Sequence, residues 1–249
     1  MSDPELLVPA RYCGPPDSGN GGWVSGSVAA LADPGTGTST GHRWPSIEVT
    51  LTAPPPLDVA LRTSRETPEG PLTLCAGETT VAAARPWATD PDPVPPVSPA
   101  VARAAAAAFS GAGHPFPTCF VCGPDRAEGD GLRIFPGPSG DGPADARRVA
   151  ATWTPDRSDA DDTAGRASLP VTWAALDCAG GWAGGIGERV MVLGRMTARI
   201  DRLPALDEEH VVVGEVRGHE GRKTFAATSL YDASGALVGC AAQTWIELR

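Results

Sequence analysis

The feature that most constrains this chain is an order of segments that occurs twice. In each half, a short segment rich in glycine and alanine is followed by about four strand-like runs. The turns between these runs are rich in glycine, proline and aspartate, as antiparallel hairpins require. One helix followed by a meander of strands indicates an α+β domain rather than a parallel α/β sheet. The repeated order therefore predicts two similar α+β domains.

The helix-like segment of the first half is GGWVSGSVAALA, and that of the second half lies within SLPVTWAALDCAGGWAGG. The strand-like runs cover residues 46–53, 57–64, 71–77 and 79–87, and then 189–203, 210–218, 223–232 and 236–248. Glycine is unfavourable in an exposed helix by about 0.5–1 kcal/mol relative to alanine. A helix that a curved sheet wraps closely tolerates glycine, because small residues permit close approach of the backbone. We therefore expect each helix to lie inside a curved sheet.

A stretch rich in proline and acid, ATDPDPVPPVSP at 88–99, separates the two halves and predicts an extended linker. The alanine run AVARAAAAAF after it predicts a short helix. The expected division is an N-terminal domain at 1–87, a linker at 88–118 and a C-terminal domain at 119–249. GDGLRIFPGP is expected to be a strand that leads into the second domain.

Composition narrows the function classes. The chain of 249 residues has 30 acidic and 20 basic residues, and this net charge of -10 argues against a nucleic-acid partner. No run reaches the roughly 18 apolar residues of a membrane span, and MSDPELLVPA does not resemble a secretion signal. The six cysteines are expected to be free thiols in a reducing compartment, so we expect a cytoplasmic protein.

With this organisation the chain resembles the double-hotdog fold, and is most similar to the type II acyl-CoA thioesterases. NGGWVSG resembles the glycine-rich opening of that family's first hotdog helix, and LYDASGALVGCAAQTWIELR resembles its final hairpin. The resemblance implies hydrolysis of an acyl thioester, either acyl-CoA or an acyl-carrier-protein thioester, without a metal or redox cofactor. Hotdog sheets commonly pair edge to edge. A double hotdog can satisfy this pairing within one chain and still assemble further, so a homo-oligomer is also open.

The resemblance also implies three catalytic side chains: an aspartate on the second hotdog helix, a hydroxyl on the next strand and a glutamine on the last strand. Asp177 and Gln243 stand at the first and third of these positions. The hydroxyl position falls on Leu193 or Gly194, and Thr197 is the nearest hydroxyl. We therefore take Asp177, Gln243 and Thr197 as candidate catalytic residues.

Asp177 lies among alanines, where an ionised carboxylate is costly unless it is paired. It is either a general base or nucleophile with a raised pKa, or a side chain that reaches solvent at a helix kink near Gly180. Cys178 beside it is interpreted as a packing residue, because no histidine is close in sequence to activate it.

Gln243 shares a strand face with Ala241 and Trp245, so we expect it to be at least partly buried. An amide at this place can orient a water or hold a thioester carbonyl, because it both donates and accepts hydrogen bonds. The alternative is a side chain that fixes the end of a neighbouring strand. We expect the side chains of Gln243 and Asp177 to converge on one cleft between the repeats.

The substrate-binding candidates come from three segments. Asn20, Gly21, Gly22 and Trp23 open the first helix, where backbone N–H groups favour an oxyanion or a phosphate. A tight turn capped by Asp17 or Asn20 is the alternative. The other substrate-binding candidates are Arg195 and Arg199, on the strand after the second helix, and Trp182 in the second half. The arginines could hold coenzyme A phosphates or form a solvated sheet edge. The tryptophans could line an acyl pocket or belong to the core.

Cys119 and Cys122 form a CxxC pair with His114 nearby. A structural zinc ion usually takes four ligands, and Cys13 is the one remote candidate that could join this pair. A redox CxxC normally opens a helix in a thioredoxin-like unit, which this segment is not. We therefore expect a packed, reduced pair and no metal.

Two other functions stay open at this level. A hotdog hydratase or dehydratase acts on enoyl or 3-hydroxyacyl thioesters with an Asp/His pair, but the four histidines, His42, His114, His210 and His219, do not stand in a recognisable helix-opening motif. A non-catalytic acyl-thioester-binding protein would fit the missing hydroxyl at Leu193 or Gly194.

Overall fold

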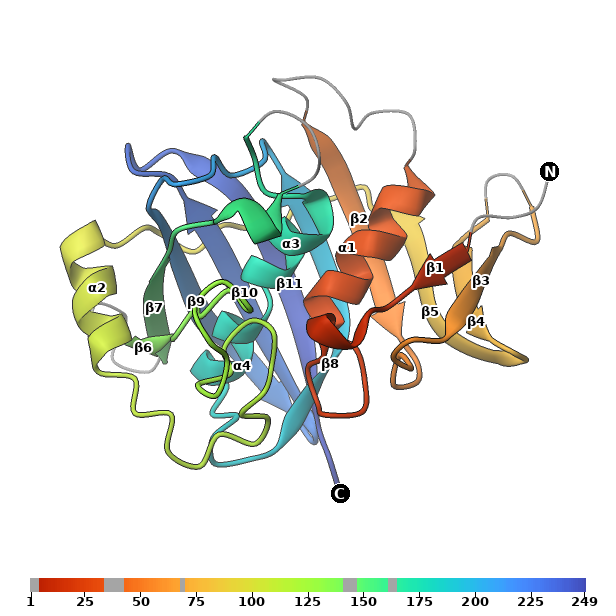
Figure 1. The fold of residues 1–249 in the computed structure, drawn as a ribbon, viewed down its shortest axis with the longest axis horizontal. Helices are drawn as coiled ribbons and strands as arrows, with labels where there is room; N and C mark the ends of the chain where they lie inside the picture. Colours follow the sequence, from red (N-terminus) through yellow and green to blue (C-terminus); the bar gives the residue numbers. More distant parts are fainter. Residues whose placement is uncertain (1–4, 34–42, 68–69, 141–146, 161–164) are drawn as a thin grey trace.

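The computed structural model describes residues 5–33, 43–67, 70–140, 147–160 and 165–249, and their strands form one antiparallel sheet (Figure 1). The strand order is β1-β3-β4-β5-β2-β8-β11-β10-β9-β7-β6. The strands of the first half are β1 (Glu5–Leu7), β2 (Trp44–Leu51), β3 (Ala60–Ser64), β4 (Leu72–Ala76) and β5 (Thr79–Pro86). Those of the second half are β6 (Gly137–Pro138), β7 (Arg148–Trp153), β8 (Met191–Ile200), β9 (His210–Glu220), β10 (Lys223–Tyr231) and β11 (Leu237–Glu247).

The two halves join edge to edge within the chain. Strand β2 pairs with β8, with Val49 opposite Met196 and Glu48 opposite Thr197. The predicted α+β class is confirmed, and each of the eight predicted strand runs overlaps one of the strands β2–β5 and β8–β11. Strands β2 and β9 extend two residues beyond their predicted runs, at the start and at the end respectively.

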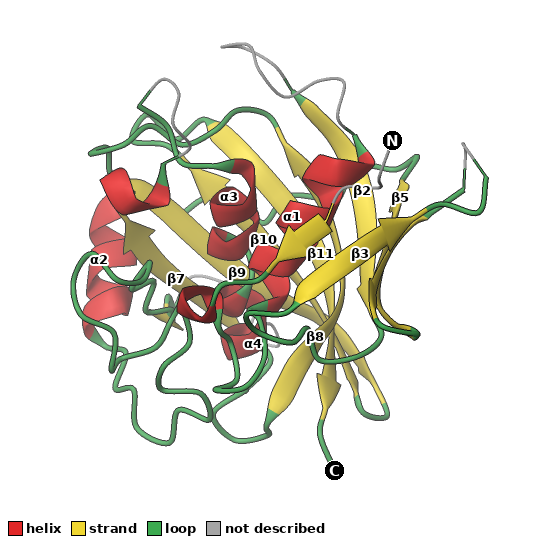
Figure 2. Ribbon diagram, turned by 45° about the vertical axis from the view of Figure 1, so that its right-hand side comes forward, coloured by secondary structure: helices red, strands yellow, loops and turns green. Residues whose placement is uncertain are grey.

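The helices are α1 (Gly21–Ala32), α2 (Pro99–Ala107), α3 (Leu169–Ala175) and α4 (Cys178–Ala183), with 3-10 turns η1 (Ala10–Tyr12) and η2 (Arg157–Asp159). Helices α1 and α3 pack against each other on one face of the curved sheet (Figure 2). A Cβ on Gly26 of α1 would lie 2.7 Å from the Cβ of Trp173, so this close contact requires glycine. None of the described helices is long and apolar enough to cross a membrane.

Residues 88–98, between the halves, form no helix or strand. The helix predicted after them is confirmed as α2. The predicted strand at GDGLRIFPGP is wrong except at its last two residues, which form β6. The N–H groups of Leu132 and Ile134 bond instead to the carbonyls of Phe120 and Val121, at 2.8 and 2.9 Å. This segment therefore packs on the CxxC turn rather than joining the ladder, and the sequence analysis missed β7, which pairs with β9.

Candidate active site

The inner helix of the second half is broken, and the break creates the candidate site. Helix α3 ends at Ala175, and α4 begins at Cys178. The N–H of Gly180 bonds to the carbonyl of Asp177 at 3.2 Å, where a continuous α-helix would direct it to Leu176. The carbonyl of Leu176 therefore needs a partner from outside the helix.

Two strand side chains supply that partner. The Gln243 amide nitrogen donates to the Leu176 carbonyl at 2.6 Å and to the Asp177 carbonyl at 3.0 Å. The Thr228 hydroxyl, fully buried on β10, donates to the same Leu176 carbonyl at 2.7 Å. Trp245 donates its indole N–H to the Gln243 carbonyl oxygen at 2.9 Å. The amide of Gln243 thus holds the backbone of the break.

The break turns the Asp177 carboxylate toward the first half of the chain. Its Oδ2 atom accepts hydrogen bonds from the Asn20 side-chain amide and the Gly22 backbone N–H, both at 2.9 Å. Its Oδ1 atom is buried and has no hydrogen-bond partner. Only 2% of Asp177 is exposed. The acid of one repeat is therefore held by the helix start of the other.

The opening of α1 is built to receive this carboxylate. Asn20 caps the helix by accepting from the Trp23 N–H at 2.9 Å, while its own amide donates to Asp177. The first turn of α1 contains no acidic residue, so Asp177 supplies the negative charge that a helix N-terminus favours. Gly22 has no room for a side chain, since a Cβ there would lie 2.5 Å from the Asp177 Cβ.

Burial dominates the electrostatics of this acid. It raises the pKa of Asp177 to about 7, and the nearby Cys119 sulfur adds to the increase. The Gly22 N–H and the Asn20 amide act in the opposite direction by stabilising the charged form. A carboxyl that titrates near neutral pH can both accept and return a proton.

The prediction that Gln243 is buried on the face of Ala241 and Trp245 is confirmed. The meeting of the two side chains in one cleft stays a prediction, because the Gln243 amide bonds to the backbone of Asp177, whereas the Asp177 carboxylate bonds to Asn20 and Gly22. The hydrogen bonds of Gln243 therefore position the backbone of the acid, and they do not place the amide to hold a water molecule.

The candidate role of Thr197 is wrong. Thr197 lies opposite Ala242, whereas Gln243 lies opposite Met196, so Thr197 points to the other face of the sheet. Leu193 lies opposite Trp245 on the inner face, and a Cβ on Gly21 would come within 2.8 Å of the Leu193 Cβ. An apolar side chain thus occupies the place expected for the hydroxyl.

The two arginines also lie away from Asp177, on the face of Thr197. Arg195 bonds to the Thr50 hydroxyl at 3.1 Å and lies 3.8 Å from a Glu48 oxygen. Arg199 forms ion pairs with Asp90 at 2.9 Å and Asp201 at 3.0 Å. The sheet-edge alternative is also wrong, because β8 lies between β2 and β11 inside the sheet. The arginines instead form ion pairs on the sheet face that carries Thr197, away from the site.

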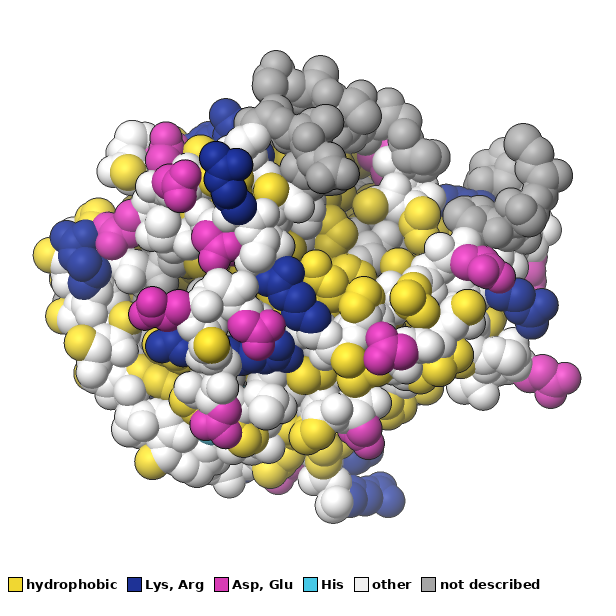
Figure 3. Space-filling model, in the orientation of Figure 1, with side chains coloured by type: hydrophobic (Ala, Val, Ile, Leu, Met, Phe, Trp, Pro, Cys, Tyr) yellow, Lys and Arg dark blue, Asp and Glu magenta, His cyan; other side chains and the backbone are white. Residues whose placement is uncertain are grey.

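The two candidate tryptophans both pack on aromatic partners. Trp23 is 8% exposed and stacks on Tyr12, with ring centroids 4.2 Å apart. Trp182 packs edge-on against His114 at 5.0 Å. Hydrophobic side chains gather in a hollow of the surface over α1 (Figure 3).

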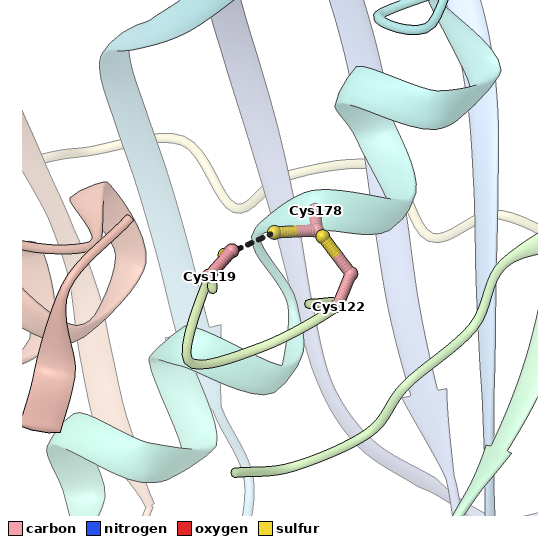
Figure 4. Close-up of side chains that lie close together, drawn as sticks. All are labelled: Cys119, Cys122 and Cys178. Carbon is pink, nitrogen blue, oxygen red and sulfur yellow. Dashed lines mark hydrogen bonds between the residues drawn. The ribbon is translucent and has the colours of Figure 1, made fainter. Parts of the chain in front are cut away.

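The cysteine pair has a third member that the sequence analysis assigned to packing. The sulfur atoms of Cys119, Cys122 and Cys178 all lie within 4.8 Å of one another (Figure 4). The pKa of the Cys119 thiol lies well below its usual range, mainly because the Cys122 and Cys178 thiols donate hydrogen bonds to its sulfur. Cys13 is not in this group, and its sulfur instead contacts Thr118 and Arg126.

The described histidines have other partners than Asp177. His114 contacts the Cys122 sulfur, His210 bonds to the Glu208 carbonyl and His219 bonds to Thr224. His42 lies outside the described residues. An Asp/His pair is therefore not seen in the part of the chain that the structure describes.

Comparison with known proteins shows the class of fold. No family model and no curated protein matches the chain. A conserved protein of unknown function with a hot dog fold from Alicyclobacillus acidocaldarius is similar, with a TM-score of 0.63 and 12% identity over 98% of this chain and 92% of that one. The chain is thus a double-hotdog protein.

Two further solved structures are similar over almost their whole length. The tesB protein of Mycobacterium avium subspecies paratuberculosis has a TM-score of 0.59 and 13% identity, covering 98% of this chain and 91% of its own. A candidate thioesterase from Novosphingobium aromaticivorans has a TM-score of 0.61 and 12% identity, covering 98% and 95%. At this identity the likeness establishes the fold.

Proposed function

We propose that this protein hydrolyses acyl thioesters and that acyl-CoA is its substrate class. The observation that carries the proposal is the Asp177 carboxylate, buried between the repeats, held by Asn20 and Gly22, and left with one free oxygen. The similarity to the candidate thioesterase from Novosphingobium supports it through the shared fold. The hydrophobic hollow over α1 offers an apolar surface of the kind that an acyl chain needs (Figure 3).

In the proposed reaction, Oδ1 of Asp177 accepts a proton from a water molecule whose oxygen attacks the thioester carbonyl carbon. The Gly22 N–H, which bonds to the acid in the structure, would also donate to the developing oxyanion. The carbon–sulfur bond then breaks, and the proton on Asp177 passes to the thiolate. The products are a carboxylic acid and a free thiol.

Gln243 and Thr228 are positioning residues in this proposal. They hold the carbonyl groups at the helix break, and this fixes the direction in which Asp177 leaves the backbone. Because Leu193 replaces the hydroxyl that the resemblance implies, the water would be oriented by Asp177 and the start of α1. The cytoplasmic location and a homo-oligomer remain predictions.

The test is a panel of acetyl-, hexanoyl-, palmitoyl- and crotonyl-CoA, with the matching acyl-carrier-protein thioesters as a second arm. Thiol release is the expected result, and the arm with the higher kcat/KM identifies the donor. A change in enoyl absorbance without thiol release would instead indicate a hydratase. Binding without turnover throughout the panel would indicate a carrier, and either outcome would overturn the proposal.

A further inference from the structure

We propose that Cys119, Cys122 and Cys178 form a binding site for one thiophilic metal ion, with Zn²⁺ as the expected ion. The three sulfur atoms lie within 4.8 Å of one another, and the Cys119 and Cys178 sulfurs are 3.7 Å apart (Figure 4). Two thiolates on a tetrahedral zinc ion are about 3.8 Å apart, given zinc–sulfur bonds of about 2.3 Å. The Cys119 and Cys178 sulfurs thus already have the spacing of two ligands of one ion, and the Cys122 sulfur lies close enough to be a third.

The turn that carries the first two cysteines is closed by a backbone hydrogen bond and requires a glycine. The Gly123 N–H bonds to the Cys119 carbonyl at 2.9 Å, which closes the turn. A Cβ on Gly123 would lie 2.5 Å from the carbonyl oxygens of both Pro117 and Cys119, so only glycine fits there. The closed turn therefore fixes the backbone of Cys119 relative to that of Cys122.

The surrounding side chains resemble the outer shell of a metal site. His114 Nε2 lies 3.2 Å from the Cys122 sulfur, while His114 Nδ1 accepts from the Phe116 N–H at 3.0 Å. Nε2 of the neutral ring therefore carries the proton and donates to the sulfur. The Trp182 ring packs on His114. His114 is thus a supporting donor, and three thiolates leave the fourth position of a tetrahedral ion to a non-protein ligand.

Burial and position give this site a structural role. The three cysteines are 3%, 3% and 5% exposed, and they come from two segments that are distant in sequence. Most of the chain between α2 and β6 has no regular structure, and so long a loop is uncommon in a compact domain unless something orders it. An ion bound here would fix that loop to the start of α4.

The site also borders the candidate active site. Cys178 directly follows Asp177, and the Asn20 amide that bonds to Asp177 lies 3.9 Å from the Cys119 sulfur. A bound ion would therefore hold the helix break at Cys178, in addition to the hydrogen bonds from Gln243. This consequence follows from the positions of the residues, and the metal proposal stands whether or not the protein hydrolyses thioesters.

The test uses the full chain, reduced and stripped of metal with a chelator, and titrated with Co²⁺ as a spectroscopic probe. One Co²⁺ per chain should bind with a thiolate-to-cobalt charge-transfer band, and one equivalent of Zn²⁺ should displace it. Zn²⁺ should also raise the melting temperature, because the ion binds the folded chain alone. Cys178→Ser should abolish the band, while Cys240→Ser, at a buried cysteine outside the group, should retain it.

His114→Phe keeps a ring against Trp182 and removes the N–H donor, so Co²⁺ should bind about 10–100-fold more weakly. If Cys178→Ser does not fold, the band and the melting shift of the native chain decide the matter. Absence of both in the native chain would overturn the proposal. A mass two units lower, with Cys119 joined to Cys178 and no metal bound by the reduced chain, would also overturn it.

Discussion

The two inner helices of this double hotdog differ at one point, and that point defines the site. In the first repeat, α1 runs unbroken over twelve residues and contributes only its start, where Asn20 and Gly22 donate hydrogen bonds. In the second repeat, the helix breaks after α3, and strand side chains satisfy the carbonyls that the break leaves open. The comparison indicates that one repeat supplies donors and the other supplies the acid.

The largest effect on stability is expected where the two repeats touch. Gly22→Ala would place a Cβ 2.5 Å from the Asp177 Cβ and 2.9 Å from the Trp173 carbonyl oxygen. Because one of these neighbours is backbone, the helices must separate, and we expect a loss of about 3 kcal/mol in the free energy of unfolding. Urea denaturation measures it. Ser27→Ala in the same helix is the control, and an equal loss in both variants would contradict the account.

Gly180, in the inner helix of the second repeat, should behave differently, because its neighbours are side chains. A Cβ on Gly180 would lie 1.7 Å from the Gln243 amide oxygen. Gly180→Ala should therefore cost about 1–3 kcal/mol in the native background, and clearly less when Gln243→Ala is also present. A double-mutant cycle gives this coupling. Strictly additive losses would show that the amide does not lie against the helix break.

The segments that precede α1 and α3 each contain an aspartate, and the two aspartates differ in burial. The difference predicts a dependence of stability on pH. Before α1, Asp17 is exposed, whereas Asp159 before α3 is 4% exposed. Burial raises the pKa of Asp159 to about 6 from 3.8, even though the Asp156 N–H opposes the shift. The neutral form thus favours the folded state. Its contribution is complete below pH 3.8 and is lost as the pH rises through about 6.

Asp159→Asn should remove this loss, because its amide does not titrate. Relative to the native chain, the variant should gain on the order of 2 kcal/mol between pH 4 and pH 7. Denaturation at both pH values measures the gain, and other titrating groups cancel in the comparison. Parallel stability profiles for the two proteins would contradict the assignment.

The smallest effect is expected at the second donor to the helix break. Thr228→Val keeps the shape of the side chain and removes the donor, while Gln243 still satisfies the Leu176 carbonyl. We expect a loss of about 1 kcal/mol. Thr244→Val on the other face of β11 is the matched control. If both variants lose the same stability, the Thr228 hydroxyl does not support the break.

Much of the frame could be predicted from sequence, because hairpin turns and small-residue helices are local patterns. The eight predicted strand runs and the helices α1 and α2 follow from such patterns. The helix break could not be predicted, since the partners of the Leu176 carbonyl lie 52 and 67 residues further along the chain. The one sign in the sequence that Thr228 has a role was its position, as a polar residue on the inner face of the predicted strand at 223–232.

The errors have equally specific causes. Thr197 seemed to be the nearest hydroxyl in sequence, but neighbouring strand residues point to opposite faces, and the bulge at Thr244 and Trp245 shifts the pairing with β8. Cys178 was assigned to packing because its partners, Cys119 and Cys122, lie in a loop almost sixty residues away. Such groupings arise from tertiary packing and leave no spacing pattern in the chain.

Thiol release by Asp177→Asn, assayed beside the native chain, tests the central claim most directly. The amide matches the carboxyl in shape and can still accept from Gly22, so circular dichroism should show an intact fold. With no base to take the proton from water, kcat should fall by about 10²–10⁴-fold. Native-level thiol release by the folded variant would contradict the assignment of Asp177 as the base.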